Sequence, residues 1–160
     1  ARGQSCAGPP GAQLDGYLRK AKMAHAKTQG RKGMTENEIA TVVVDAAYKF
    51  DTALGPGLLE SAYEALLIYE LRKRGPKVAP QQPMLLIYDG VEMDVGYRAD
   101  LVVEDKVSVE LKSVERMAAV HYKQLLTYVR VSDRRLGLLI NLGMPLISDG
   151  IRRVVNQLEE

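Results

Sequence analysis

Three charged residues in the second half of the chain have the types and the spacing of groups that do chemistry together. Glu110 and Lys112 alternate with apolar residues in the stretch VSVELKSVE, so their side chains share one face of a predicted strand. Asp100 lies on the preceding predicted strand. If residues 104–106 form a three-residue hairpin loop, Asp100 falls directly opposite Glu110, with Cβ atoms about 4.5–5.5 Å apart.

Two carboxylates at that distance repel each other, and in a half-buried site one carboxyl pKa rises unless a cation intervenes. Lys112 supplies one positive charge, and a divalent metal ion would supply two more. Hard oxygen ligands with room for water favour Mg²⁺ or Mn²⁺. Such an ion lowers the pKa of a bound water and polarises a phosphoryl oxygen, while Lys112 orients that water or stabilises the developing charge. This set therefore points to hydrolysis of a phosphodiester bond.

The same residues also fit simpler interpretations. Most charged cross-strand groups form salt bridges on a solvated sheet face, and Asp100, Glu110 and Lys112 could be one such ladder. Another alternative is an acid/base hydrolase that uses the two carboxylates on a different substrate. The neighbouring lysine and the lack of sugar-binding aromatics, with no tryptophan and Phe50 as the single phenylalanine, argue against that hydrolase. Spacing alone leaves the salt-bridge interpretation open.

Two helices are predicted ahead of the strands. Thr35 and Glu38 have the spacing of a capping box, and an apolar stripe of helical period follows them as far as Phe50. Gly55-Pro56-Gly57 ends this helix, because glycine can adopt the C-terminal cap and proline cannot continue the ladder. A second helix is expected over 58–74. Its predicted apolar side comprises Leu59, Ala62, Leu66 and Leu67.

The remaining elements are predicted to be mostly strands. The expected strands cover 84–88, 91–95, 97–103, 107–112, 136–142 and 151–155, with one further helix over 118–131. Asp89-Gly90 is a strong hairpin signal between the first two strands. This order predicts an α/β fold with a central mixed sheet of four to five strands flanked by helices.

Composition places the chain among ordinary globular proteins, with 46% hydrophobic and 26% charged residues. We expect one domain over 34–160, preceded by a basic, disordered extension over 1–33. Residues 1–34 hold seven of the 22 basic residues and one of the 20 acidic ones, so the remainder carries 15 basic and 19 acidic residues. The body is therefore acidic, and it must bind any polyanion through a local basic surface or through metal ions.

Cellular location is constrained by the cysteine count and by hydrophobicity. Cys6 is the single cysteine, so the chain forms no internal disulfide, and a reducing, cytoplasmic location is expected. The apolar runs fall well short of the roughly 20 residues that a membrane helix needs. No membrane partner is expected.

The ordered set of residues resembles a known family pattern. Asp100, a gap of nine residues and Glu110-Leu111-Lys112 are similar to the D…(D/E)xK pattern of the PD-(D/E)XK nuclease superfamily, which includes restriction endonucleases, RecB-type exonucleases and junction resolvases. The stretch Gly57-Leu58-Leu59-Glu60-Ser61-Ala62-Tyr63 resembles the name motif of the GxxExxY family, small bacterial proteins grouped with that superfamily. The resemblance covers residues 35–160. It implies a restriction-endonuclease-like core and nuclease activity.

The resemblance implies a role for each matched residue. Asp100 and Glu110 would hold Mg²⁺ or Mn²⁺, with the backbone carbonyl of Leu111 as a further ligand. Lys112 would serve the attacking water, and Glu60 would reach the same metal from the helix before the sheet. A glutamate at a helix start is also favoured by the helix dipole, which requires no metal. Both explanations of Glu60 are kept.

Further candidates come from the helix predicted over 118–131. Gln124 and Tyr128 match the Q-x-x-x-Y helix motif of RecB-type nucleases, and Gln124 is counted with the catalytic residues. His121, Tyr128 and Tyr63 are candidate substrate contacts. His121, Gln124 and Tyr128 form a polar stripe of the kind that any surface helix also has. The proline of the superfamily name is Ala99 here, a position that only shapes the strand.

Nucleic acid is the partner that the resemblance implies, with DNA expected in preference to RNA. A homodimer is left open. The alternative function is that of a non-catalytic nucleic-acid-binding or regulatory protein that retains the nuclease fold.

Overall fold

The computed structural model describes residues 33–93 and 97–158. The expected N-terminal extension, 1–33, lies outside these ranges except for Gly33. The chain divides into two units, and the larger one comprises Met34–Leu86 and Asp94–Glu160. This larger unit contains every residue of the candidate site.

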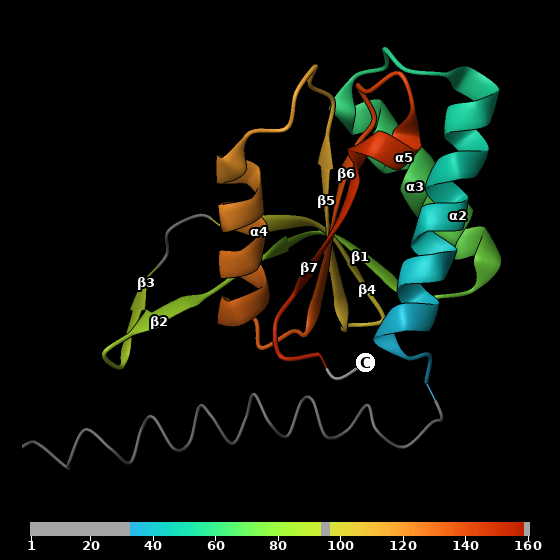
Figure 1. Cartoon of the computed structure of the whole chain (residues 1–160). Helices are drawn as coiled ribbons and strands as arrows, with labels where there is room; N and C mark the ends of the chain where they lie inside the picture. The colour runs from blue at the N-terminus through green and yellow to red at the C-terminus, as the bar shows by residue number, and fades with distance from the viewer. Residues whose placement is uncertain (1–32, 94–96, 159–160) are drawn as a thin grey trace, which may run out of the picture. The chain divides into compact units, whose positions relative to one another are not determined.

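The larger unit is a mixed sheet with helices on both faces (Figure 1). Its helices are α2 (Glu36–Leu54), α3 (Glu60–Arg74), α4 (Ala119–Val131) and the short α5 (Ile147–Gly150). Its strands are β1 (Val78–Pro83), β4 (Arg98–Val103), β5 (Val107–Lys112), β6 (Leu136–Asn141) and β7 (Ile151–Val155). The five strands lie in the order β1-β4-β5-β6-β7, with β5 and β6 parallel and the other neighbours antiparallel. The predicted α/β architecture is confirmed.

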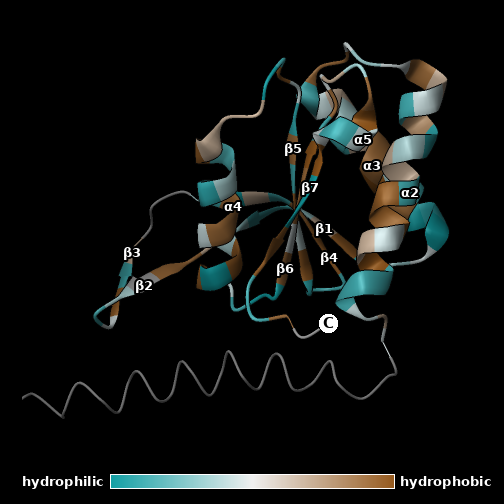
Figure 2. Cartoon of the chain, viewed as in Figure 1, coloured by the Kyte–Doolittle hydropathy of each residue, from teal (hydrophilic) through white to brown (hydrophobic). Residues whose placement is uncertain are grey.

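Helix α2 begins where its sequence predicts. The Glu38 N–H donates to Thr35 Oγ1 at 3.2 Å, and the Thr35 N–H donates to Glu38 Oε2 at 2.7 Å, which completes the capping box. The helix ends at Leu54, ahead of Gly55, whose φ is +72°. The predicted apolar stripe is largely buried against the sheet, and Figure 2 shows hydrophobic residues on α2, α3 and the central strands.

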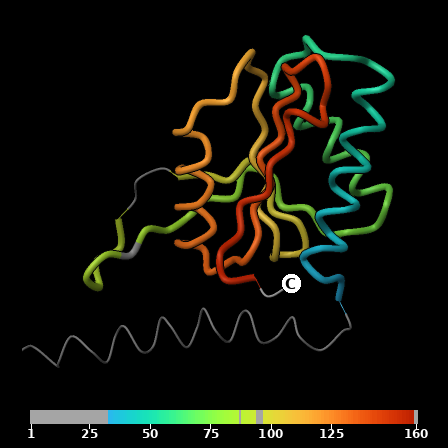
Figure 3. The backbone as a smooth tube through the Cα atoms, in the orientation of Figure 1, coloured from blue at the N-terminus to red at the C-terminus, as the bar shows by residue number. Residues whose placement is uncertain are grey.

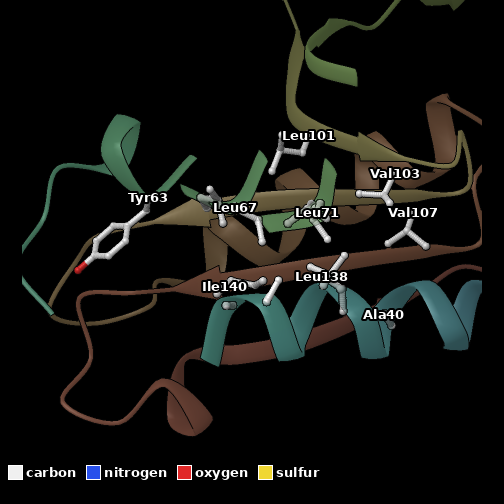
Figure 4. Packing of buried hydrophobic residues seen from close by; sticks show 14 of the residues in the cluster. Ala40, Tyr63, Leu67, Leu71, Leu101, Val103, Val107, Leu138 and Ile140 are labelled. Carbon is white, nitrogen blue, oxygen red and sulfur yellow. The ribbon is translucent and has the colours of Figure 1, made fainter. Parts of the chain in front are cut away.

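Helix α3 packs only in part through the predicted side: Leu67 is buried and Leu66 is partly buried against the core, as predicted. Tyr63, Leu67 and Leu71 are fully buried, whereas Leu59 is 77% exposed and precedes the helix. The three buried residues recur every four positions and face the core together (Figure 4). The prediction missed Tyr63 and Leu71, because the aromatic ring of Tyr63 was not counted with the apolar stripe.

The opposite face of the sheet is covered by α4. Leu125 and Val129 of this helix pack with Leu139 and Val154 of the sheet. A Cβ on Gly137 would lie 2.8 Å from Val129 Cγ2, so the glycine in β6 lets the helix approach the sheet closely. Helix α4 lies in the connection between the parallel neighbours β5 and β6, as Figure 3 shows.

The sequence did not predict strand β1. It contains Pro80 and Pro83, and it pairs only with β4, at one edge of the sheet among the described residues. Proline lacks the N–H that a ladder needs, so proline-containing strands occur at edges. The segment was missed because its composition argued against a strand.

A second, two-stranded sheet consists of β2 (Leu86–Tyr88) and β3 (Val91–Met93). Asp89 and Gly90 between them have φ values of +51° and +74°, as the Asp-Gly hairpin signal predicts. Strand β2 is shorter than the predicted 84–88, and the last two residues of the predicted strand 91–95 lie outside the described residues. No helix in the described residues is long and apolar enough to cross a membrane.

Candidate active site

The hairpin of β4 and β5 has the register that the sequence predicts. Val103 is paired with Val107 and Leu101 with Val109, so Asp100 comes next opposite Glu110. The turn is tight: Lys106 N–H donates to the Val103 carbonyl at 3.0 Å, and residues 104 and 105 have φ values of 52° and 56°. Counting back from this loop was sufficient to bring the two carboxylates together.

Regular backbone pairing of β4 is interrupted at Asp100 on the β1 side, where it resumes at Ala99, and ends before Asp100 on the β5 side. On the β1 side, the residue opposite is Gln81, which has a φ of +48° and lies outside the ladder. On the β5 side, the last pair is Leu101 with Val109. Beyond it, the Leu111 N–H donates to Asp100 Oδ2 at 2.8 Å. The Asp100 carboxylate thus takes the place of a backbone acceptor, which fixes its position against β5.

Glu110 and Lys112 do not lie on a solvated face. Glu110 is 7% exposed, and its Oε1 accepts a hydrogen bond from Lys112 Nζ at 2.7 Å. Its second oxygen, Oε2, is buried without a hydrogen-bond partner among the described residues. The Glu110–Lys112 salt bridge of the simpler alternative is present, but it is largely buried and does not lie on a solvated face. A buried carboxylate oxygen that lacks a partner is costly and needs a physical reason.

The candidate site holds more negative than positive charge, and this imbalance shifts the pKa values of Glu110 and Lys112. Burial raises the pKa of the Glu110 carboxyl, and the negative charges of Asp100 and Glu60 raise it further, while Lys112 opposes them. Burial by itself lowers the pKa of Lys112, but the hydrogen bond to Glu110 and the surrounding carboxylates outweigh it, so that pKa also rises. Three carboxylates share one ammonium, and a divalent cation would relieve both shifts.

Glu60 comes to the site from the other side of the sheet's end, as the first residue of α3. It is exposed, and its charge acts on both Glu110 and Lys112. The loop before α3 is fastened to the end of β5, because Ser113 Oγ donates to the Leu58 carbonyl at 3.0 Å. This contact brings the start of α3 close to the end of β5, where the charge of Glu60 acts on Glu110 and Lys112.

Tyr63 has a structural role. Its ring is fully buried, and its hydroxyl donates to the Gly55 carbonyl and accepts the Leu58 N–H, both at 3.1 Å. Gly57, with a φ of +111°, makes the turn that these bonds close. The glycine turn and the Tyr63 hydrogen bonds of the G-x-x-E-x-x-Y stretch thus fix the position of Glu60 at the start of α3. This geometry favours positioning over the substrate contact suggested for Tyr63.

Helix α4 contributes the other candidates. Gln124 is exposed on the helix surface, and His121 Nδ1 accepts the Ala118 N–H at 3.3 Å at the first turn. Tyr128 is partly buried, and burial followed by the negative charge of Glu110 raises its pKa. Tyr128 therefore lies near the carboxylates, whereas the structure gives His121 a helix-capping contact.

Two residues beside the site were missed by the sequence reasoning. The ring of Tyr97 meets that of Tyr128 edge-on, with centroids 5.4 Å apart. Asn141, the register partner of Lys112, is fully buried and forms hydrogen bonds to the Val114 N–H and carbonyl at 3.0 and 2.7 Å. The one signal for Asn141 was a polar residue at the end of an otherwise apolar strand. Contacts of Tyr97 cross 31 residues of sequence and leave no local pattern.

The donor set fits a hard divalent cation in its chemistry. Asp100, Glu110 and Glu60 offer carboxylate oxygens, and one of these is buried without a partner. In a strand, the N–H and C=O of one residue point to the same neighbour, so the Leu111 carbonyl also faces the Asp100 side of β5. Within residues 33–93 and 97–158, no three Asp, Glu, His or Cys side chains already stand at metal-binding distance from one another.

Comparison with known proteins adds one finding to this geometry. No curated protein and no solved structure matches the chain. A family model described as the PD-(D/E)XK nuclease superfamily matches residues 37–154, which include both helices before the sheet, the β4–β5 hairpin, α4 and most of β7. The chain therefore belongs to the PD-(D/E)XK nuclease superfamily.

Proposed function

We propose that the chain is a divalent-metal-dependent nuclease and that it belongs to the GxxExxY group of the superfamily. The observation that carries the proposal is the buried Oε2 of Glu110, which lacks a partner while Asp100 and Glu60 add further negative charge. An unpaired buried carboxylate oxygen destabilises the fold, and beside two further carboxylates it is best explained by a site for a cation. The same oxygen is a ready ligand for a cation.

Asp100, Glu110 and Glu60, with the Leu111 carbonyl, would hold Mg²⁺ or Mn²⁺. The ion would supply charge neutralisation at the phosphate and a more acidic bound water. Asp100 is held in place by the Leu111 N–H, and Glu110 by the Lys112 ammonium. Lys112, which donates a hydrogen bond to Glu110, would act as a positive charge that orients water and stabilises a developing anion.

Gln124 and His121 lie on α4, the helix that also brings Tyr128 close to Glu110. We assign them to contacts with the substrate backbone or with the attacking water. Nucleic acid is the substrate, with DNA expected ahead of RNA, and the acidic body makes its binding depend on the metal. The functional domain covers residues 34–160.

The test is cleavage of end-labelled single- and double-stranded DNA and RNA by the full chain with Mg²⁺, Mn²⁺ or EDTA. Asp100→Asn, Glu110→Gln and Lys112→Ala should each reduce the rate by about 10²-fold or more. Asp45→Asn is the matched control, because Asp45 is exposed on α2, away from the site. Calorimetric titration with Mn²⁺ accompanies each variant.

Equal rates in the wild type and in the three variants would contradict the catalytic assignment. If the wild type cleaves none of the substrates and binds no metal, the chain is a non-catalytic member of the superfamily, and the alternative of a binding or regulatory protein replaces the proposal.

A further inference from the structure

Tyr97 is an exposed aromatic residue held in place at the edge of the candidate site. Its side chain is 39% exposed, and its ring meets Tyr128 at a centroid distance of 5.4 Å and an interplanar angle of 63°. Its backbone carbonyl accepts the Met84 N–H at 2.8 Å, which fixes the chain where β4 begins. Edge-to-face contact is a favourable aromatic geometry, and it restrains the Tyr97 ring before any ligand arrives.

The two tyrosines differ in what surrounds them. Tyr128 packs against Met84, Ala99 and Val102, so much of its ring belongs to a small apolar cluster. Tyr97 is not part of that cluster and keeps a large part of its surface open. Because the rings are inclined to each other, they cannot both lie flat on one ligand. Tyr97 is the ring that remains available for stacking.

Tyr97 lies near the carboxylates both along the chain and through its contact with Tyr128. Tyr97 is three residues before Asp100 in extended chain, which spans about 10 Å. The charges of Glu110 and Asp100 both act on Tyr128, the ring that Tyr97 touches. Arg98, exposed and two residues before Asp100 on β4, adds a cation to this stretch of the chain, which suits a phosphate.

We propose that Tyr97 stacks on an unpaired base next to the phosphate bound at Asp100, so that the substrate is a single strand or a frayed strand end. Stacking on an aromatic ring accepts any base, because every base has a π-face, but the base must have left its own helical stack. A base inside an intact duplex is already stacked on both faces. The inference rests on the proposed nuclease function and specifies its substrate class.

The test compares the full chain with Tyr97→Ala, Tyr97→Phe and Tyr48→Ala. Tyr48 lies on α2 and is also 39% exposed, which makes it a matched control. The substrates are one labelled strand, the same strand annealed to its complement, and the same strand with an abasic site beside the cleaved bond. We expect the wild type to prefer the single strand and Tyr97→Ala to lose about tenfold or more in kcat/KM on it.

Tyr97→Phe should keep the activity, because the ring and not the hydroxyl makes the contact, and Tyr48→Ala should leave it unchanged. The abasic strand should slow the wild type to the rate of Tyr97→Ala and leave that variant unaffected. An equal effect of Tyr97→Ala on single strand and duplex, or an abasic effect of the same size in both proteins, would overturn the proposal.

A binding measurement separates failure of the stacking proposal from failure of the nuclease assignment. If the wild type cleaves nothing, fluorescence anisotropy with a labelled single-stranded oligonucleotide in Ca²⁺ still compares the wild type with Tyr97→Ala. Weaker binding by about tenfold in the variant supports the stacking role without catalysis, and equal binding rejects it.

Discussion

The Leu111 N–H donates to the Asp100 carboxylate at 2.8 Å, in the place where the backbone ladder between β4 and β5 has ended. A side chain therefore completes the hydrogen bonding of the strand that carries Glu110 and Lys112. Charge-assisted bonds of this kind are short and directional, so Asp100 is fixed without help from any ligand.

Asp100→Asn should lower the pKa of Glu110. The charge of Asp100 is second only to burial in raising that pKa, and asparagine removes the charge while its Oδ1 can still accept the Leu111 N–H. The measurement is a metal-free titration of the carboxyl carbon resonances by NMR. Asp45→Asn should leave the Glu110 titration unchanged. An unaltered Glu110 pKa in Asp100→Asn would mean that the charge of Asp100 does not act on Glu110.

Tyr63→Phe should destabilise the fold by about 1–3 kcal/mol, because the Gly55 carbonyl and the Leu58 N–H both lose their hydroxyl partner. Urea unfolding gives the free energy, and hydrogen exchange of the Leu58 amide should become faster. Tyr48→Phe, at an exposed position on α2, should change neither quantity. A stable Tyr63→Phe with a protected Leu58 amide would contradict the structural role.

Asn141→Leu should cost about 3 kcal/mol or more. The leucine has a similar size, but it leaves the Val114 N–H and carbonyl and the Gly143 N–H without their partner. Urea unfolding measures the loss. Asn37→Ala is the control, because Asn37 is exposed and makes one surface contact with Arg153. If the two variants lose the same free energy of unfolding, the hydrogen bonds of Asn141 to Val114 and Gly143 are not important for stability.

Glu70 should make stability depend on acid pH. The hydrogen bond from Lys49 is the main cause that lowers the pKa of Glu70, with the charges of Lys49, Lys73 and Arg74 adding to it against the effect of burial. A carboxyl whose pKa is lowered by folding stabilises the native state above its unfolded pKa of about 4.3 and loses that contribution as the pH falls through the folded pKa.

The measurement for Glu70 is thermal unfolding of the wild type and Glu70→Gln at neutral pH and near pH 3. The variant should melt at a lower temperature at neutral pH, and the difference should shrink in acid. The same substitution in a Lys49→Met background should have a smaller effect, because the main partner is gone. A pH-independent difference would show that packing and not charge is responsible.

Much of the site could be predicted from local sequence because its geometry is local. Two strands joined by a short loop have a register that depends only on the loop length, and this placed Asp100 opposite Glu110. The capping box of Thr35 and Glu38 is equally local. The burial of Glu110 was missed because the alternation in β5 indicates one polar face, whereas α4 covers that face.

Features that depend on distant segments had no pattern in the sequence. The β1 ladder breaks opposite Asp100 at Gln81, which belongs to a strand that was not expected at all. The pairing of Tyr97 with Tyr128 requires the sheet and α4 to be in place. The hydrogen bond from Ser113 to the Leu58 carbonyl, just before α3, depends on where β5 ends. Tertiary packing, and not local secondary-structure propensity, determines each of these contacts.

The prolines of β1 affect how copies of the chain meet one another. Among the described residues, β1 and β7 are the two edges of the sheet. Pro80 and Pro83 leave β1 with fewer N–H donors than a regular strand, so this edge is a poor template for an added strand. At the other edge, antiparallel pairing of β7 with its copy would bring the exposed Arg152 and Arg153 of both chains together. Each edge is thus protected against sheet extension, one by missing donors and one by like charge, which guards the protein against edge-to-edge aggregation.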